Sequence, residues 1–127
     1  MPSGGCSQVI ARPTGGKRAL GSATTTSAYQ TVITITPPSG KRLKIAKSLV
    51  SCTEDTYYRF LWNGQAIRDV GSVDGEVYVA ARIPFPDWYG WGFGGEMLGD
   101  GSKSFTVQVR QVTATGTCYF EVDYDEV

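Results

Sequence analysis

Hydrophobic and polar residues alternate along most of the chain with the two-residue period of a half-buried β-strand. No stretch has the 3.6-residue period of an amphipathic helix. The clearest runs are residues 103–113 and 117–125, separated by a turn at 114–116. Their predicted inward positions are Phe105, Val107, Val109, Cys118, Phe120, Val122 and Tyr124.

Two strands are predicted in the first half of the domain. Residues 28–36 are dense in β-branched side chains, with Ile33 and Ile35 expected to face inward. After the turn at 37–40, residues 41–53 alternate first with Leu43 and Ile45 inward, then with Val50 and Cys52 inward. A change of phase within one strand predicts a bulge near Ala46 and Lys47.

The strongest local signal is the Asn63-Gly64 pair between residues 56–62 and 65–70. Asn-Gly between two alternating runs favours a two-residue type I′ hairpin, because both central residues need a positive φ. A further strand is expected over residues 73–81, beginning at the Asp74-Gly75 turn.

Together these signals predict seven or eight antiparallel strands with short turns. Two packed sheets bury one face of each strand, so we predict an all-β antiparallel β-sandwich, of the jelly-roll type, over residues 28–127. An immunoglobulin-like sandwich is the alternative, although Trp62 follows Cys52 too closely to lie across the core from it. Residues 1–27, rich in Gly, Ser and Thr, are expected to form an extended N-terminal arm.

Composition removes several classes of function. The chain has no histidine, which excludes Ser-His-Asp and Cys-His catalysis and imidazole metal ligands. Its three cysteines make no even disulfide set, and Cys52 and Cys118 are expected to be small core residues. Cys6 could pair between chains only in an oxidising setting. No apolar stretch of about 18 residues is present, so we expect a soluble chain made in the cytosol that does not span a membrane.

Charge is balanced overall but divided between the two halves of the chain. Residues 1–53 carry seven basic residues and no acid, whereas residues 54–127 carry five basic residues and all 12 acids. We expect the halves to neutralise each other, within a sheet or between subunits. The outward acids of the last strand, Glu121, Asp123, Asp125 and Glu126, are then expected to form a solvated or salt-bridged edge, with Lys41, Arg42 and Lys44 as the partners inside the chain. Nucleic acid is not an expected partner, since there is no Arg-rich run.

The remaining carboxylates mark no catalytic or metal site. Most sit in turns, where Asp is favoured by the backbone, and no two are marked as a glycosidase pair. Asp100 and Glu96 could hold calcium, but residues 99–102 are better explained as a tight turn. We therefore predict no catalytic residue, no metal site and no cofactor.

Residues 82–101 carry an unusual concentration of aromatic side chains among prolines and glycines. The candidate interface residues are Phe85, Trp88, Tyr89, Trp91 and Phe93. They could form a lid on the core, a platform for sugars, or a surface buried against another subunit, where Trp and Tyr are favoured. The lid and the subunit surface are compatible with each other.

Several segments resemble the small all-β virion proteins of tailed bacteriophages, the capsid decoration or cement class. They are the Gly/Ser/Thr-rich start, residues 37–45 (PPSGKRLKI), the Leu61-Trp62-Asn63-Gly64 hairpin, and the closing pair 104–109 and 118–124. The resemblance lies in strand rhythm over residues 28–126, and no functional residue is carried over from it.

The resemblance implies a structural protein without enzymatic activity, located in the virion and made in the host cytoplasm. It implies a homo-oligomer, with a trimer favoured, that docks on a major capsid protein or another virion protein. The alternative is a carbohydrate-binding module or receptor-binding domain that binds a glycan through Trp88, Tyr89 and Trp91.

Overall fold

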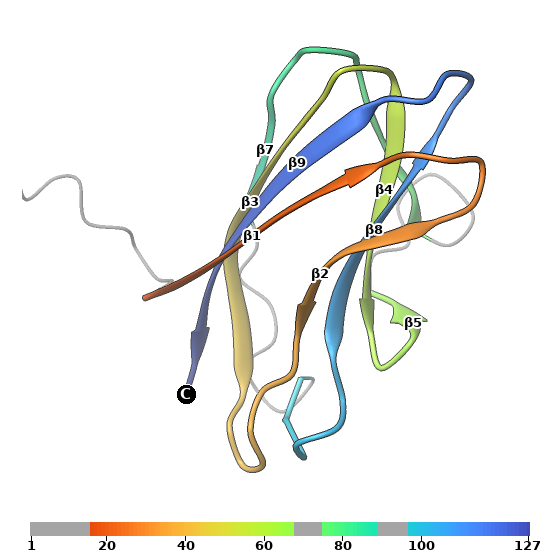
Figure 1. Ribbon diagram of the computed structural model, residues 1–127. Coiled ribbons are helices and arrows are strands. Elements are labelled where there is room, and N and C mark those ends of the chain that lie inside the picture. Colours follow the sequence, from red (N-terminus) through yellow and green to blue (C-terminus); the bar gives the residue numbers. More distant parts are fainter. Residues whose placement is uncertain (1–15, 68–74, 89–96) are drawn as a thin grey trace, which may run out of the picture.

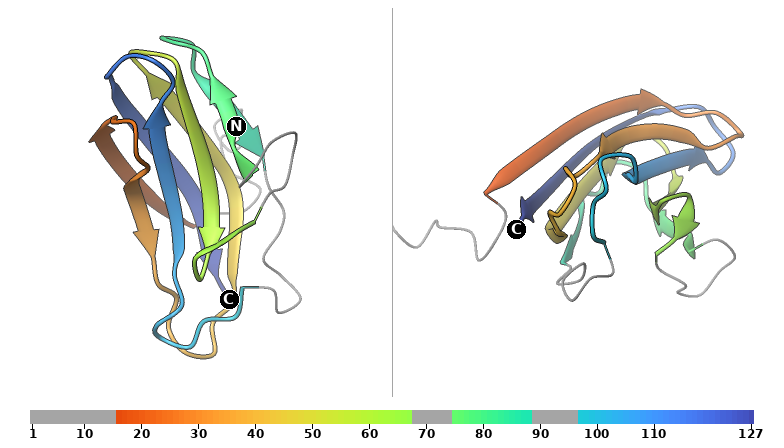
Figure 2. Two further views of the ribbon diagram at one scale, coloured as in Figure 1. Left: turned by 90° about the vertical axis from the view of Figure 1, so that its right-hand side faces the viewer. Right: turned by 90° about the horizontal axis from the view of Figure 1, so that it is seen from below.

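The computed structural model describes residues 16–67, 75–88 and 97–127, and these residues form an all-β antiparallel sandwich (Figure 1). Two sheets pack face to face, as the views in Figure 2 show. The strands are β1 (Lys17–Thr24), β2 (Gln30–Ile35), β3 (Leu43–Cys52), β4 (Thr56–Trp62), β5 (Gln65–Ala66), β6 (Val77–Val79), β7 (Phe85–Trp88), β8 (Phe105–Gln111) and β9 (Thr117–Glu126). The predicted β-sandwich is confirmed.

The strand pairs are nested along the chain. β1 pairs with β9, β2 with β8, β3 with β7, and β4 with both β5 and β6, always antiparallel. One sheet therefore has the order β1-β9-β3-β7, and the other has β2-β8-β4-β5, with β6 also on β4. The chain crosses from one sheet to the other at each connection between these strands except β4 to β5 and β5 to β6, which stay in one sheet. The first and last strands, β1 and β9, are neighbours.

The core lies between the sheets and is centred on aromatic rings. Tyr58 and Phe60 of β4 meet Phe120 of β9 edge to face, with ring centroids 5.3 and 6.0 Å apart, and Phe60 stacks on Phe105 of β8. The inward residues predicted for the four runs 28–36, 41–53, 103–113 and 117–125 are buried, with Tyr124 half-buried against the same cluster. The phase of alternation was therefore predicted correctly throughout.

Two local features also match the expectations. Asn63 and Gly64 have φ values of 51° and 81°, and Trp62 pairs with Gln65 across them. In β3, the register against β9 shifts between Ile45 and Lys47, which is the predicted bulge. The second hairpin strand is shorter than expected, because β5 ends at Ala66.

The sandwich begins earlier than the predicted boundary at residue 28. β1 is a full strand of the β1-β9-β3-β7 sheet, although its residues fall inside the expected arm 1–27. Gly21 explains how it packs: a Cβ at this position would lie 2.4 Å from the carbonyl oxygen of Val32 in β2. The two strands lie side by side at one edge of the sandwich (Figure 2).

Cys52 and Cys118 are core residues, as predicted, but their bond to each other was not predicted from the sequence. Both are buried, at 2% and 0% exposure, but they are direct partners in the β3–β9 register and form a disulfide. The pattern of alternation identifies inward positions, but it does not show which strands become neighbours. Cys6 lies outside the described residues.

The last strand is not an edge of the sheet. β9 lies between β1 and β3, so its acids face basic residues on both sides. The expected neutralisation between the two halves of the chain is confirmed, because Lys17, Arg18 and Lys47 all form ion pairs with β9. Of the expected partners, Lys44 lies opposite Asp125 in the register, whereas Lys41 and Arg42 precede the strand.

Candidate interaction face

The side of the β1-β9-β3-β7 sheet that points away from the core, called here the outer face, carries exposed apolar side chains. Leu20 on β1 is 70% exposed, Leu49 on β3 is 38% exposed and Tyr119 on β9 is 58% exposed. Leu20 and Leu49 lie on either side of Glu121, and the exposed Pro86 of β7 lies opposite Leu49. One row across all four strands is therefore mostly apolar.

A row of charges runs beside this apolar row. Asp123 has no exposed surface and lies between Arg18, whose Nε is 3.3 Å from Oδ1, and Lys47, whose Nζ is 4.0 Å from Oδ2. Arg18 Nε also lies 3.4 Å from Oε2 of Glu121. These charges are paired within the sheet, so a partner that covers the apolar row does not have to bury an isolated charge. Exposed apolar residues rimmed by paired charges are typical of protein-binding surfaces.

Of the five aromatic candidates, the structure describes the side chain of Phe85. It is half-buried and packs against the core, with its ring 6.1 Å from that of Tyr58. This is the position that a core lid requires. The backbone of Trp88 lies opposite Lys47, and Tyr89, Trp91 and Phe93 lie outside the described residues.

The aromatic segment 82–101 contains a short strand. β7 occupies Phe85–Trp88 and pairs with residues 47–50 of β3, so the prolines allow a short edge strand, as is known for proline at sheet edges. At the other end of the segment, Met97 is buried and its carbonyl accepts a hydrogen bond from Leu43 N. Both ends of the segment are thus attached to β3.

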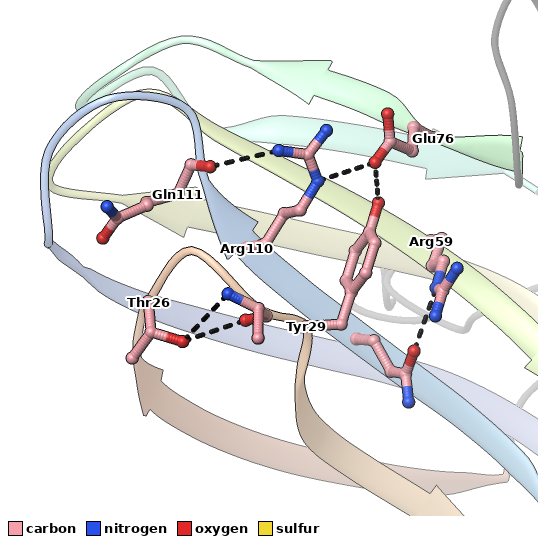
Figure 3. A network of polar contacts seen from close by, with 8 residues as sticks. Thr26, Tyr29, Arg59, Glu76, Arg110 and Gln111 are labelled. Atoms are coloured by element: carbon pink, nitrogen blue, oxygen red, sulfur yellow. Dashed lines mark hydrogen bonds and ion pairs between the residues drawn. The ribbon is translucent and has the colours of Figure 1, made fainter.

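The β2-β8-β4 sheet carries a different set of side chains on its outward side (Figure 3). Glu76, just before β6, accepts hydrogen bonds from the Tyr29 hydroxyl and from Arg110 Nε, the latter at 2.7 Å. The Arg59 guanidinium lies over the Tyr29 ring at 3.8 Å and donates to Gln108. Arg110 lies over the Tyr57 ring at 4.5 Å. Residues from four separate segments meet in this cluster, which we call the Tyr29–Glu76 clasp.

The electrostatics of the clasp are those of a satisfied network. The hydrogen bond from Arg110 lowers the pKa of Glu76 and raises the pKa of Arg110, while burial and the bond to Glu76 raise the pKa of Tyr29. A guanidinium group lies over the ring of Tyr29 and another over the ring of Tyr57, as in cation–π pairs. The clasp therefore fixes β6 and the start of β2 onto β8.

The turn at residues 99–102 agrees with the explanation from sequence. Asp100 Oδ1 accepts hydrogen bonds from Ser102 N, Ser102 Oγ and Lys103 N, and Gly101 has a φ of 87°. The two backbone bonds are the main reason that the pKa of Asp100 falls to about 2. Among the described residues, no three potential metal ligands come together. In the same residues, no helix of sufficient length and hydrophobicity to cross a membrane is found.

Sequence reasoning did not identify the outer face or the clasp. Leu20, Leu49 and Tyr119 come from three segments, and only the register between strands brings them into one patch. Glu76 and Arg110 are likewise distant in sequence. The alternation did give one usable signal: because Cys118 and Phe120 are predicted to face inward, Tyr119 between them is left on the outward side.

Comparison with known proteins adds no relative. No protein-family model, curated protein or solved structure matches this chain. The described residues define the architecture, an all-β sandwich with an apolar row on the outer face of one sheet.

Proposed function

We propose that this chain is a non-enzymatic structural protein of a bacteriophage virion, a capsid decoration protein or a related accessory protein, which docks on a protein lattice through its outer face. The observation that carries the proposal is the exposed apolar row of Leu20, Leu49 and Pro86, with exposed Tyr119 two residues from that row on β9, beside charges that form ion pairs within the sheet. Such a row is suited to burial against another protein surface. Trp88 is the last residue of the edge strand β7 in the same sheet.

The topology supports the finer assignment of the fold as a jelly roll. The first strand pairs with the last, the second with the next to last, and so on inward. This nested pairing results when a long hairpin is rolled into two sheets. Viral shell proteins commonly use this architecture. Because one fold hosts many functions, the topology agrees with the virion proposal without carrying it.

The test uses the particles made by the virus whose genome encodes the chain. Purified chain is mixed with particles that lack it, and binding is measured by co-sedimentation. We expect saturable binding that is lost in Leu49→Lys and weakened in Trp88→Ser with Trp91→Ser. Thr34→Lys, exposed on the other sheet, is the matched control and should bind normally. Failure to find the chain in particles and to reconstitute binding would refute the proposal.

The same variants distinguish glycan binding, the alternative function, from docking on a protein lattice. If Trp88, Tyr89 and Trp91 form a sugar site, the double Trp→Ser variant loses glycan binding while Leu49→Lys retains it. A glycan array without hits for the folded wild-type chain would eliminate this alternative.

A further inference from the structure

We propose that two copies of this chain pair through the free edge of β1, so that the two β1-β9-β3-β7 sheets become one; this goes beyond the proposed docking function. β1 pairs with β9 on one side, and no described strand pairs with its other side. Alternate residues of a strand direct their N–H and C=O groups to opposite sides. The free side of β1 therefore presents a row of backbone groups that another strand can bind.

β1 is the least protected of the described edges. β2 is bulged between Thr31 and Ile33, and β7 is four residues long and contains Pro86. Bulges, short strands and prolines are the usual devices that prevent edges from pairing. β1 has none of them: it is eight residues long with an alternating sequence and no proline.

The two charges of β1 do not guard its edge either. Lys17 Nζ lies 2.7 Å from Glu126 Oε1, and Arg18 Nε lies 3.3 Å from Asp123 Oδ1, so both cations are directed toward β9. An edge lysine blocks pairing when its charge must lose water to admit another strand. Here the cations already have carboxylate partners in their own sheet.

The sequence of β1 is compatible with pairing to itself. A two-fold axis at Leu20 places this residue opposite Leu20 of the second copy, with Arg18 opposite Ser22 of the second copy. Lys17 is then opposite Ala23 of the second copy, so no two cations face each other. Leu20 is 70% exposed in the single chain, and in the pair it contacts Leu20 of the second copy, which removes apolar surface from water.

This arrangement has a consequence for the proposed docking function. The combined sheet has the order β7-β3-β9-β1-β1-β9-β3-β7, and the two outer faces become one surface with Leu20 at its centre. A contact in which the same patch is used by both copies closes at two subunits. The inference therefore predicts a dimer, in place of the trimer expected from the virion resemblance.

Light scattering over a concentration series tests the pairing on the full chain. The expected mass is twice the 13.7 kDa of the chain for wild type, rather than one or three times. Leu20→Lys should reduce the mass to that of the monomer, while Leu49→Lys, the same change on an inner strand of the same face, should leave the dimer intact. A wild-type monomer at all concentrations, or a dimer lost only in Leu49→Lys, would overturn the inference.

A cross-link keeps the test decisive if Leu20→Lys fails to fold. In a Cys6→Ser background, Leu20→Cys should give a covalent dimer on mild oxidation, and Leu49→Cys should not. Equal cross-linking of the two variants would contradict edge pairing. A monomer that still binds particles would refute edge pairing and leave the proposed docking function standing. A dimer that binds no particle would refute the docking function and leave edge pairing standing.

Discussion

Removal of the Cys52–Cys118 disulfide tests how much the covalent link between β3 and β9 stabilises the fold. The two cysteines are paired residues of β3 and β9, the central strands of one sheet, and their Cα atoms are 4.1 Å apart. They are 66 residues apart in sequence, so the bond closes a loop that contains β4 through β8. The perturbation is Cys52→Ala with Cys118→Ala, or reduction of the wild-type chain.

The expected cost follows from the size of that loop. In the chain-entropy treatment, cross-linking a loop of this length lowers the entropy of the unfolded chain enough to stabilise the fold by about 4 kcal/mol. With the denaturant dependence usual for a domain of this size, the guanidinium chloride midpoint should fall by roughly 1 M. The strands should still pair, because their hydrogen bonds and inward side chains are retained.

The assay combines denaturation curves with a count of thiols. The unreduced chain, once denatured, should expose one reactive thiol, from Cys6, and three after reduction. Cys6→Ser is the control and should leave the midpoint unchanged. Three reactive thiols before reduction, or equal midpoints for wild type and the double alanine variant, would refute the reasoning.

Two further predictions concern packing. Phe105→Ala and Phe120→Ala should each cost about 3–5 kcal/mol, because both rings lie in the aromatic centre of the core, while Tyr119→Ala, mostly exposed, should change the free energy of unfolding by less than about 1 kcal/mol. Near-neutral urea midpoints for both Phe variants would show that the inward face is wrongly assigned. Gly21→Ala should cost about 1–3 kcal/mol, since its Cβ meets the Val32 carbonyl oxygen at 2.4 Å, and unchanged stability would contradict the close approach of β1 to β2.

The sequence was sufficient for the parts of the fold that depend on neighbouring residues. Alternation determined which side of β8 and β9 faces the core, since a shift of one residue would expose Phe105 or Phe120. The Asn63-Gly64 turn and the bulge near Lys47 are likewise local, because each depends on a backbone conformation or a change of phase within a few residues.

The parts that the sequence did not predict depend on pairing over long distances. β1 reads as a Gly/Ser/Thr-rich arm, and it becomes a strand because β9 supplies backbone partners and Gly21 permits contact with β2. β7 forms within a proline-containing segment for the same reason, beside β3. The outer face could not be predicted for the same reason, since its apolar residues are brought together only once β1, β9, β3 and β7 are in register.

The Tyr29–Glu76 clasp makes a final prediction, because it should weaken at both ends of the pH scale. The pKa of Glu76 is lowered in the fold, so its contribution is complete above the ordinary value of 4.5 and is lost as the pH falls through the lower folded pKa. The pKa of Tyr29 is raised, so its contribution is complete below 10.0 and declines as the pH rises above that value. Glu76→Gln should therefore flatten the acid side of the stability profile relative to wild type, and Tyr29→Phe the alkaline side, each at a cost of about 1–3 kcal/mol near neutral pH. Urea denaturation across the pH range measures both differences. If the two profiles run parallel to that of wild type, the clasp does not hold β6 and the start of β2 to the sheet, and its arginines become candidates for binding a ligand instead.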